Sequence, residues 1–338
     1  MSTIFSAYKA AFMGATDRIK LCNWLIASEG ACTSELVNEL SASRWKKEID
    51  VDIRILTGLR RDMIHPDDDA ERGSIRDHFE TIERFGNDGI ALRCHPDYHA
   101  KFCVADNAGI VSSANLLENS LNGELGAGDP KVHTNYELGC ILTDELAVRS
   151  MEYLFDAMWH VALYNYGITA EGYHVRPESV RHLDGATASP QGNENLKISW
   201  TLCLDGAEDR YLKDEIVRLI RAAKRDVLLS SMTYKPVEPI HGLLKKIARA
   251  GKSVVLLVRE SSAKHATSLP DLQSAGVVVR LVPYSHAKFL VVDGKEASVF
   301  TANIEEKGLE RGAEVGITFD DVKMVDEVLE FAGAMTGD

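Results

Sequence analysis

The sequence predicts an α/β protein with two similar α-β-α lobes, each a mostly parallel sheet flanked by helices. Two observations support this prediction. One short stretch of sequence occurs twice, and strand-like and helix-like segments alternate in the same order before each copy. At 338 residues, the chain is long enough for two lobes with substantial apolar cores.

The repeated stretch occupies residues 89–106 and 276–293, which are 187 positions apart (276 − 89). Gly, Arg, Pro, His, Ala, Lys, Phe, Val and Asp recur at matched positions, and most other pairs exchange one small or apolar residue for another. Such a match indicates an internal duplication. Each half of the chain should therefore contain the same arrangement of strands and helices.

The first half begins with an apolar run at 17–27, which predicts a buried strand. A helix is expected next, with Thr33 as its N-cap and an end near residue 47. The same criteria predict a strand at 51–59, an acidic loop at 66–71, a helix at 75–85, the strand pair of the first copy, and a closing helix at about 145–164 that carries Trp159, Tyr164 and Tyr166.

The second half repeats this order of strands and helices around the second copy. Helical spacing of apolar residues predicts helices, and short β-branched runs predict strands. The expected elements are a helix at 211–223, a strand at 226–232, a helix at 239–250, a strand at 253–259 and a short helix at 269–275.

The boundary between the halves is predicted from composition. Residues 184–195 read DGATASPQGNEN, which is the most linker-like segment of the chain. We therefore expect a first lobe at 1–183, a linker at 184–196 and a second lobe at 197–338.

The overall composition indicates an ordinary globular protein with a formal charge of −13. No run approaches the roughly 20 apolar residues of a membrane span, and the N-terminus lacks the features of a signal peptide. We therefore expect a cytoplasmic protein. The six cysteines form no Cys-x-x-Cys pair and are expected to be reduced core residues, and no histidine cluster has zinc spacing.

Each copy of the repeat places a histidine two residues before a lysine. On a strand, residues two apart point to the same face, so His99 and Lys101 form one pair and His286 and Lys288 another. Polar residues follow both pairs in the same order: Ser113, Asn115 and Glu137 in the first half, and Thr301, Asn303 and Glu314 in the second.

The doubled His-x-Lys-x4-Asp pattern, each copy followed by a hydroxyl-x-Asn tract, resembles the phospholipase D superfamily of phosphodiesterases. The resemblance covers both halves, from about residue 15 to residue 316. It implies the phospholipase D fold, with two lobes related by a pseudo-twofold axis and both motifs meeting at one active site.

The resemblance also implies a mechanism in which one histidine attacks phosphorus and forms a covalent phosphohistidine. The other protonates the leaving oxygen and then activates water or an alcohol. A histidine pKa of about 6.5 allows one ring to start neutral and the other protonated. Following a family tendency for the first motif, we expect His99 to be the nucleophile.

The remaining polar residues have expected roles around this pair, with no metal or cofactor required. Lys101, Lys288, Asn115 and Asn303 would stabilise charge on the phosphate oxygens, Glu137 and Glu314 would orient the imidazoles, and Ser113 and Thr301 would contact the phosphate or these partners. Asp106 and Asp293 are expected to be structural, because aspartates in turns commonly bond their own backbone.

The motif leaves the phosphodiester substrate open. Few large apolar residues occur in the loop at 118–134, and basic residues fall at helical spacing around 218–225 and 245–252. These features favour a nuclease of a restriction or phage-defence system that acts on nucleic acid, with DNA preferred over RNA and defence proteins as partners. The alternatives are a phospholipase D or phosphatidyl transferase, and a catalytically silent nucleic-acid-binding or scaffolding subunit. The active unit is expected to be a monomer or homodimer.

Overall fold

The computed structural model describes most of the chain. The described residues are 4–45, 51–59, 69–122, 134–169, 172–177, 190, 192–193, 195–204, 206–264 and 267–337.

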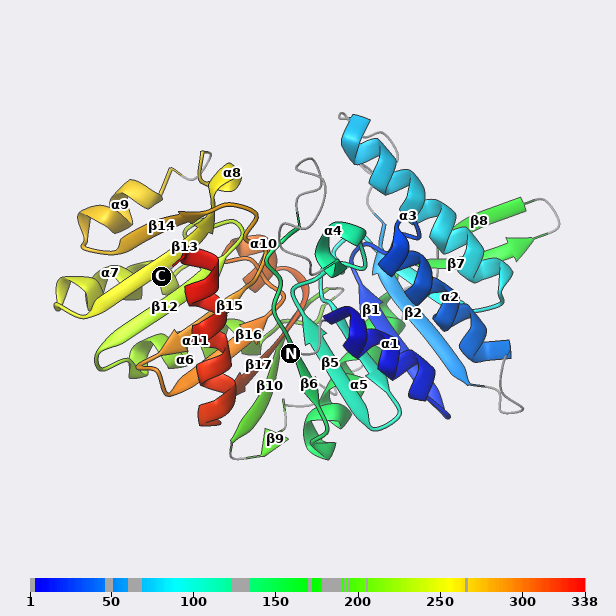
Figure 1. Ribbon diagram of the computed structural model, residues 1–338, viewed down its shortest axis with the longest axis horizontal. Helices are drawn as coiled ribbons and strands as arrows, with labels where there is room; N and C mark the ends of the chain where they lie inside the picture. Colours follow the sequence, from blue (N-terminus) through cyan, green and yellow to red (C-terminus); the bar gives the residue numbers. More distant parts are fainter. Residues whose placement is uncertain are drawn as a thin grey trace.

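The first lobe contains an eight-stranded sheet with the order β6-β5-β4-β1-β2-β3-β7-β8 (Figure 1). Its strands are β1 (Arg18–Asn23), β2 (Asp52–Gly58), β3 (Ala91–His95), β4 (Phe102–Ala105), β5 (Ala108–Ser112), β6 (Gly139–Leu142), β7 (Tyr164–Thr169) and β8 (Gly172–Pro177).

The second lobe repeats six of these strands in the same order, β17-β16-β15-β12-β13-β14, and extends the sheet at the other edge through β10 and β11. The short β9 also pairs with β10. The strands are β9 (Gly192–Asn193), β10 (Leu196–Cys203), β11 (Asp209–Arg210), β12 (Asp226–Ser231), β13 (Ser253–Arg259), β14 (Val278–Val282), β15 (Phe289–Val292), β16 (Glu296–Phe300) and β17 (Gly312–Phe319).

Both sheets are mixed, where mostly parallel sheets were expected. Only the trios β1-β2-β3 and β12-β13-β14 are parallel, and the other ladders are antiparallel. The reason is the length of the connections. Only residues 106–107 join β4 to β5, and only residues 293–295 join β15 to β16, which is too short for the crossover that a parallel pair requires.

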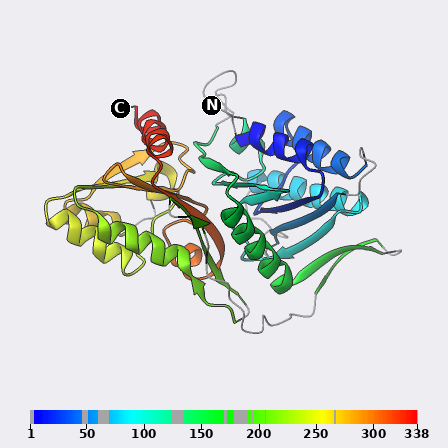
Figure 2. The ribbon, with the colours of Figure 1, turned by 90° about the horizontal axis from the view of Figure 1, so that it is seen from below.

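Helices cover both faces of each sheet (Figure 2). In the first lobe, α1, α2 and α3 pack on one face and α5 on the other; in the second, α6, α7 and α9 oppose α11. The helices are α1 (Ile4–Gly14), α2 (Ala31–Trp45), α3 (Asp69–Asn87), α4 (Glu118–Leu121), α5 (Glu145–Val161), α6 (Tyr211–Ala222), α7 (Ile240–Arg249), α8 (Glu260–Ala263), α9 (Leu269–Ser274), α10 (Glu306–Leu309) and α11 (Val322–Thr336). The predicted class, α/β with two similar lobes, is confirmed.

One apolar core is shared by the two lobes. It joins the inner faces of both sheets through α5 and α11, and it includes Phe155 of α5 and Trp200 of β10. The ring of Tyr153 also lies 6.3 Å from the ring of Trp200. Because apolar burial is the main stabilising contribution in folding, this shared core fixes the lobes relative to each other.

Several predicted boundaries differ from the structure. Helix α2 begins at Ala31, and its N-terminus is satisfied by the side chain of Glu118, which accepts from Cys32 N at 3.0 Å, so Thr33 is not its cap. Helix α5 ends at Val161, and Tyr164 and Tyr166 belong to β7. Helix α3 begins at Asp69, so residues 69–71 of the expected acidic loop are helical and the helix starts before the predicted residue 75. Residues 66–68 and most of the linker at 184–196 lie outside the described residues, and the lobe boundaries stay predictions.

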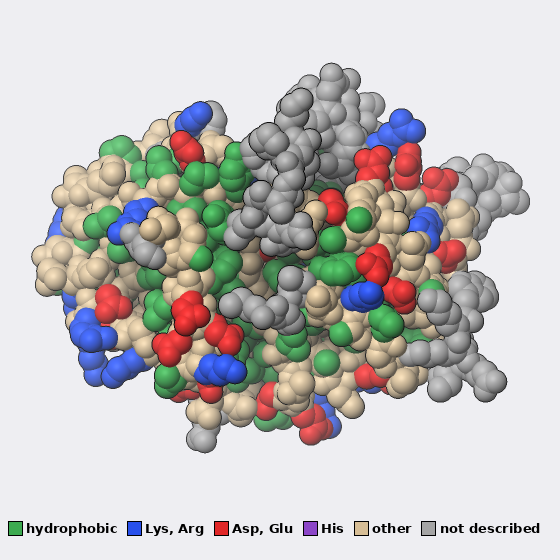
Figure 3. All heavy atoms as spheres, in the orientation of Figure 1, with side chains coloured by type: hydrophobic (Ala, Val, Ile, Leu, Met, Phe, Trp, Pro, Cys, Tyr) green, Lys and Arg blue, Asp and Glu red, His purple; other side chains and the backbone are tan. Residues whose placement is uncertain are grey.

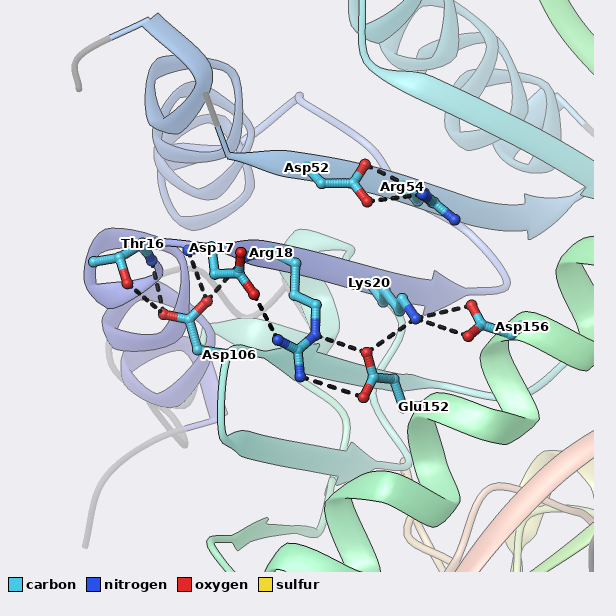
Figure 4. A network of polar contacts seen from close by, with 9 residues as sticks. All are labelled: Thr16, Asp17, Arg18, Lys20, Asp52, Arg54, Asp106, Glu152 and Asp156. Carbon is cyan, nitrogen blue, oxygen red and sulfur yellow. Dashed lines mark hydrogen bonds and ion pairs between the residues drawn. The ribbon is translucent and has the colours of Figure 1, made fainter. Parts of the chain in front are cut away.

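Three ion pairs attach α5 to β1 in the first lobe (Figure 4). Arg18 Nε donates to Glu152 at 2.7 Å, and the largely buried Lys20 contacts Glu152 at 3.0 Å and Asp156 at 2.8 Å. These contacts orient the helix that carries the apolar residues of the interlobe core.

Asp106, in the turn after β4, binds the backbone that enters β1 (Figure 4). Its carboxylate accepts from the backbone N–H groups of Thr16, Asp17 and Arg18 at 2.7 to 3.0 Å. In the second lobe, Asp293 accepts from Lys224, Arg225 and Asp226 in the same way. The repeated aspartates are therefore structural, but they bind a neighbouring strand entry instead of their own turn.

Replacing Asp106 with alanine is expected to lower the free energy of unfolding by about 2 kcal/mol, because three backbone donors lose a charged acceptor. Urea unfolding measures the change. Asp52→Ala is the matched control, since Asp52 is exposed and forms an ion pair with Arg54, whose loss should cost under about 0.5 kcal/mol. Equal losses in the two variants would contradict the role of Asp106.

Candidate active site

The two repeated motifs meet between the lobes. Isolated parallel bridges join Tyr98 to Ala313 and Ser285 to Tyr136. Each motif therefore pairs with the residue just before a glutamate of the other lobe, Glu314 or Glu137. His99 N donates to Ala313 O at 3.2 Å, and His286 N donates to Tyr136 O at 3.1 Å. Both histidines lie just before the strands β4 and β15, not within them.

Each imidazole is held by a glutamate from the opposite lobe. His99 Nδ1 donates to Glu314 at 2.7 Å, and His286 Nδ1 donates to Glu137 at 2.8 Å. A carboxylate on Nδ1 fixes the ring and its tautomer, so Nε2 is the nitrogen left to face a substrate. The site is complete only when both lobes are in place.

Ser113 and Thr301 position these glutamates. Ser113 Oγ donates to Glu137 and accepts from Leu138 N at 3.0 Å. Thr301 Oγ1 donates to Glu314 and accepts from Val315 N at 3.0 Å. The structure therefore places both hydroxyls behind the carboxylates, and direct contact with a phosphate stays a prediction.

The two lysines are fully buried beside the histidines. Lys101 Nζ donates to the carbonyl of His99, and Lys288 Nζ donates to that of His286, both at 2.6 Å. Burial lowers the pKa of Lys101 to about 8 and that of Lys288 to about 7, although both glutamates oppose the shift. A buried cation that is only partly compensated favours an anionic ligand.

The histidines differ in exposure. The side chain of His99 is 27% exposed, and that of His286 is 8% exposed. Burial lowers both pKa values, that of His286 to about 4, while the paired glutamates oppose the shift. One ring was expected to start protonated. Without substrate, both instead favour the neutral form, so the negative charge of a bound phosphodiester is what would favour a proton on the second ring.

The glutamates remain ionised despite their burial. Burial raises the pKa of Glu137 and of Glu314, but the paired histidine, the nearby lysine and the hydroxyl donor more than offset this, so both pKa values lie below the ordinary range. Two carboxylates and two lysines thus share a water-poor centre whose charges approximately balance.

Asn115 and Asn303 occupy matching positions two residues after Ser113 and Thr301. Within the described part of the chain, the buried Oδ1 atom of each amide has no hydrogen-bond partner. Unpaired buried polar atoms are uncommon in folded proteins, and here they occur at matching positions in the two lobes.

Sequence reasoning missed Trp24 and Arg259, which lie at the carboxyl ends of β1 and β13. The Trp24 ring lies 6.0 Å from the ring of His99, and Lys307 Nζ lies 5.9 Å from the Trp24 ring. Burial lowers the pKa of the half-buried Arg259, and Glu137 opposes the shift. Ligands commonly bind at the carboxyl ends of parallel strands. The positions of Trp24 and Arg259 at or near the ends of predicted strands could therefore have identified them as candidates from the sequence.

The basic residues expected to bind nucleic acid are partly neutralised. Arg218 pairs with Glu215 at 2.8 Å and also with Glu296, and Lys245 pairs with Asp271 at 2.6 Å. On the face shown in Figure 3, lysine and arginine occur in small separate groups and form no continuous band. Among the described helices, none combines the length and the apolar character needed to cross a bilayer.

The family model described as "Cardiolipin synthase, PLD-like domain" matches residues 8–159 and 216–335, which is most of the chain. The chain is 29% identical over 182 residues to a cardiolipin synthase of Geobacillus sp. (strain WCH70), covering 50% of this chain and 33% of that protein. It is 24% identical over 255 residues to the major cardiolipin synthase of Bacillus subtilis (strain 168), covering 71% of this chain and 48% of that protein. The chain thus spans less than half the length of these curated relatives.

Solved structures support the fold. The phosphatidylserine synthase of Haemophilus influenzae Rd KW20 superposes with a TM-score of 0.69 at 14% identity, over 98% of this chain and 84% of that chain. The polyphosphate kinase of Porphyromonas gingivalis gives a TM-score of 0.60 at 15% identity, over 97% of this chain and 47% of that one.

The expectation of a nuclease is wrong, and so are the expected nucleic-acid partner and the role in phage defence. The curated relatives are named for the synthesis of a phospholipid, and none of the names above refers to nucleic acid. The motif could not decide this point, because His/Lys pairs specify chemistry at a phosphodiester and carry no information about what the phosphate links.

Proposed function

The chain belongs to the cardiolipin synthase, PLD-like domain family within the phospholipase D superfamily, and from this premise we propose that it is a phosphatidyl transferase acting on phospholipids. Its superfamily makes it an enzyme of phosphodiester chemistry. The phosphodiester chemistry is supported by the pair of His–Glu contacts across the lobes, at 2.7 and 2.8 Å, with a buried lysine beside each histidine. The phospholipid substrate is supported by the names of the relatives, which are cardiolipin synthases. The full activity, a cytoplasmic location and the oligomeric state remain predictions.

In the first step, Nε2 of His99 attacks the phosphorus of the donor lipid. A P–N bond forms while the P–O bond to the leaving alcohol breaks, and His286 gives its proton to the departing oxygen. The products are a covalent phosphatidyl-His99 and the free alcohol. His99 suits the attack because it is the more exposed of the two rings.

In the second step, the acceptor alcohol enters from the side that the leaving alcohol vacated. His286, now neutral, takes the hydroxyl proton as the alcohol oxygen attacks phosphorus and the P–N bond breaks. His99 is regenerated and His286 is again protonated. Water in place of the alcohol would give hydrolysis, so the outcome depends on which hydroxyl occupies this position.

Charge on the non-bridging oxygens rises in both transition states. Lys101 and Lys288 are already buried at the site and need no desolvation when the reaction occurs. The amides of Asn115 and Asn303 can add donors from both lobes. Preorganised donors of this kind commonly supply the largest single contribution to catalysis.

The proposal is tested by incubating the protein with phosphatidylglycerol vesicles and ethanol in EDTA, and identifying the lipids by mass spectrometry. We expect phosphatidylethanol, and none from His99→Ala. His160→Ala is the matched control, because His160 is exposed on α5 and lies outside the site. Phosphatidic acid alone, at every ethanol concentration, would identify a hydrolase instead of a transferase, and an absence of lipid turnover would overturn the proposal.

A further inference from the structure

Arg259 is a half-buried cation at the edge of the active site without an acidic partner among the described residues. It ends β13 and is in register with Val282, four residues before His286. Several other cations of this lobe have acidic partners, such as Lys235 with Glu305 at 2.7 Å. Removing an unpaired guanidinium partly from water costs free energy. An anionic ligand that paired with Arg259 would offset this cost.

Its neighbours place Arg259 on the His286 side of the site. Tyr136 N donates to Tyr284 O at 3.0 Å, which brings Tyr284 next to the segment that carries Glu137. The charge of Glu137 and the Tyr284 side chain both act on Arg259. Tyr284 also has a φ of 57°, a left-handed conformation that is unusual for an aromatic residue and concentrates at functional sites.

The first lobe has no cation at the equivalent position. Arg259 N donates to Met232 O at 3.3 Å, and the matching contact in the first lobe runs from Gly58 N to Trp24 O at 3.1 Å. A Cβ at Gly58 would lie 2.1 Å from a ring carbon of Trp24. An indole therefore fills the space near His99 that a guanidinium side chain occupies near His286, and the two halves of the site differ in charge.

We propose that Arg259 binds a phosphate carried by the acceptor alcohol, in addition to the phosphate at which the reaction occurs. This inference rests on the proposed transferase function, in which His286 serves the entering alcohol, so the acceptor lies on the side of Arg259. In the proposed mechanism, two lysines and two asparagines contact the reacting phosphate. A planar guanidinium then offers bidentate recognition to a second phosphate.

The first experiment measures acceptor choice. Wild-type protein, Arg259→Gln and Arg259→Lys receive a phosphatidyl donor with equal concentrations of sn-glycerol 3-phosphate and glycerol. We expect the ratio of phosphorylated to neutral product to fall about 10- to 100-fold in Arg259→Gln and less in Arg259→Lys. Arg149→Gln, which removes an exposed charge on α5, should keep the wild-type ratio. An unchanged ratio in Arg259→Gln would overturn the inference.

A binding measurement separates this inference from the proposed function. In calorimetry, the wild-type protein should bind glycerol 1,3-bisphosphate about 10- to 100-fold more tightly than glycerol 3-phosphate, and Arg259→Gln should lose this preference. If the protein turned over no lipid but kept this Arg259-dependent preference, only the transferase proposal would fail. Equal affinity for both probes in the wild type would overturn the second phosphate site.

Discussion

His286→Ala is expected to trap the phosphatidyl group on His99 when the donor carries a 4-nitrophenol leaving group. Nitrophenolate departs without a proton, so the first step survives the loss of the acid. The second step needs a base to take the proton of the acceptor, and that base is missing. We expect a burst of one nitrophenolate per site, followed by turnover slowed by about 10²- to 10⁴-fold.

The adduct should be found on the peptide that contains His99, by mass spectrometry after rapid quenching in alkali. His99→Ala should show no burst and a loss of activity on the order of 10⁴-fold or more, because no nucleophile remains. His160→Ala again serves as the control. An adduct on His286 in the His99→Ala variant would reverse the assignment of the two histidines.

Lys288→Met is expected to reduce kcat by about 10²- to 10³-fold, as is common when one preorganised donor to a developing oxyanion is removed. Burial lowers the pKa of Lys288 to about 7 and that of Lys101 to about 8. Each lysine is cationic below its pKa and neutral above it. Wild-type activity should therefore fall as the pH rises through about 7 and again through about 8.

The pH profile of Lys288→Met distinguishes an electrostatic role from a structural one. With Lys288 absent, the fall near pH 7 should disappear and only the fall near pH 8, which belongs to Lys101, should remain. Lys224→Met removes an exposed lysine and should leave the wild-type profile intact. The role proposed for Lys288 fails if the Lys288→Met profile keeps both falls.

The strands and helices were predictable where local pattern alone decides them. The strand at 253–259 matches β13, and the helix at 211–223 is nearly α6, because apolar spacing and flanking breakers are encoded locally. Predicted boundaries were wrong where a residue far away in the chain determines the end of an element. The start of α2 depends on Glu118, about 86 residues away in the chain, which no local cap signal reveals.

The substrate was the feature that the sequence predicted least well. Basic residues at helical spacing look the same in a sequence whether they face solvent, bind a polyanion or pair with acids. In the structure, Arg218 lies between Glu215 and Glu296, so part of the expected binding face serves stability. The names of the relatives then pointed to phospholipid.

The sequence by itself determined the duplication, the two His/Lys pairs and the polar residues that follow them, because these are matched at fixed spacing along one chain. Only the tertiary structure decided how they combine. Each histidine takes its glutamate from the other lobe, and Arg259 faces one half of the site while Trp24 fills the equivalent place in the other. The physical reason is that the shared interlobe core sets these contacts, and a repeat in sequence cannot tell whether its copies pair within a lobe or across two.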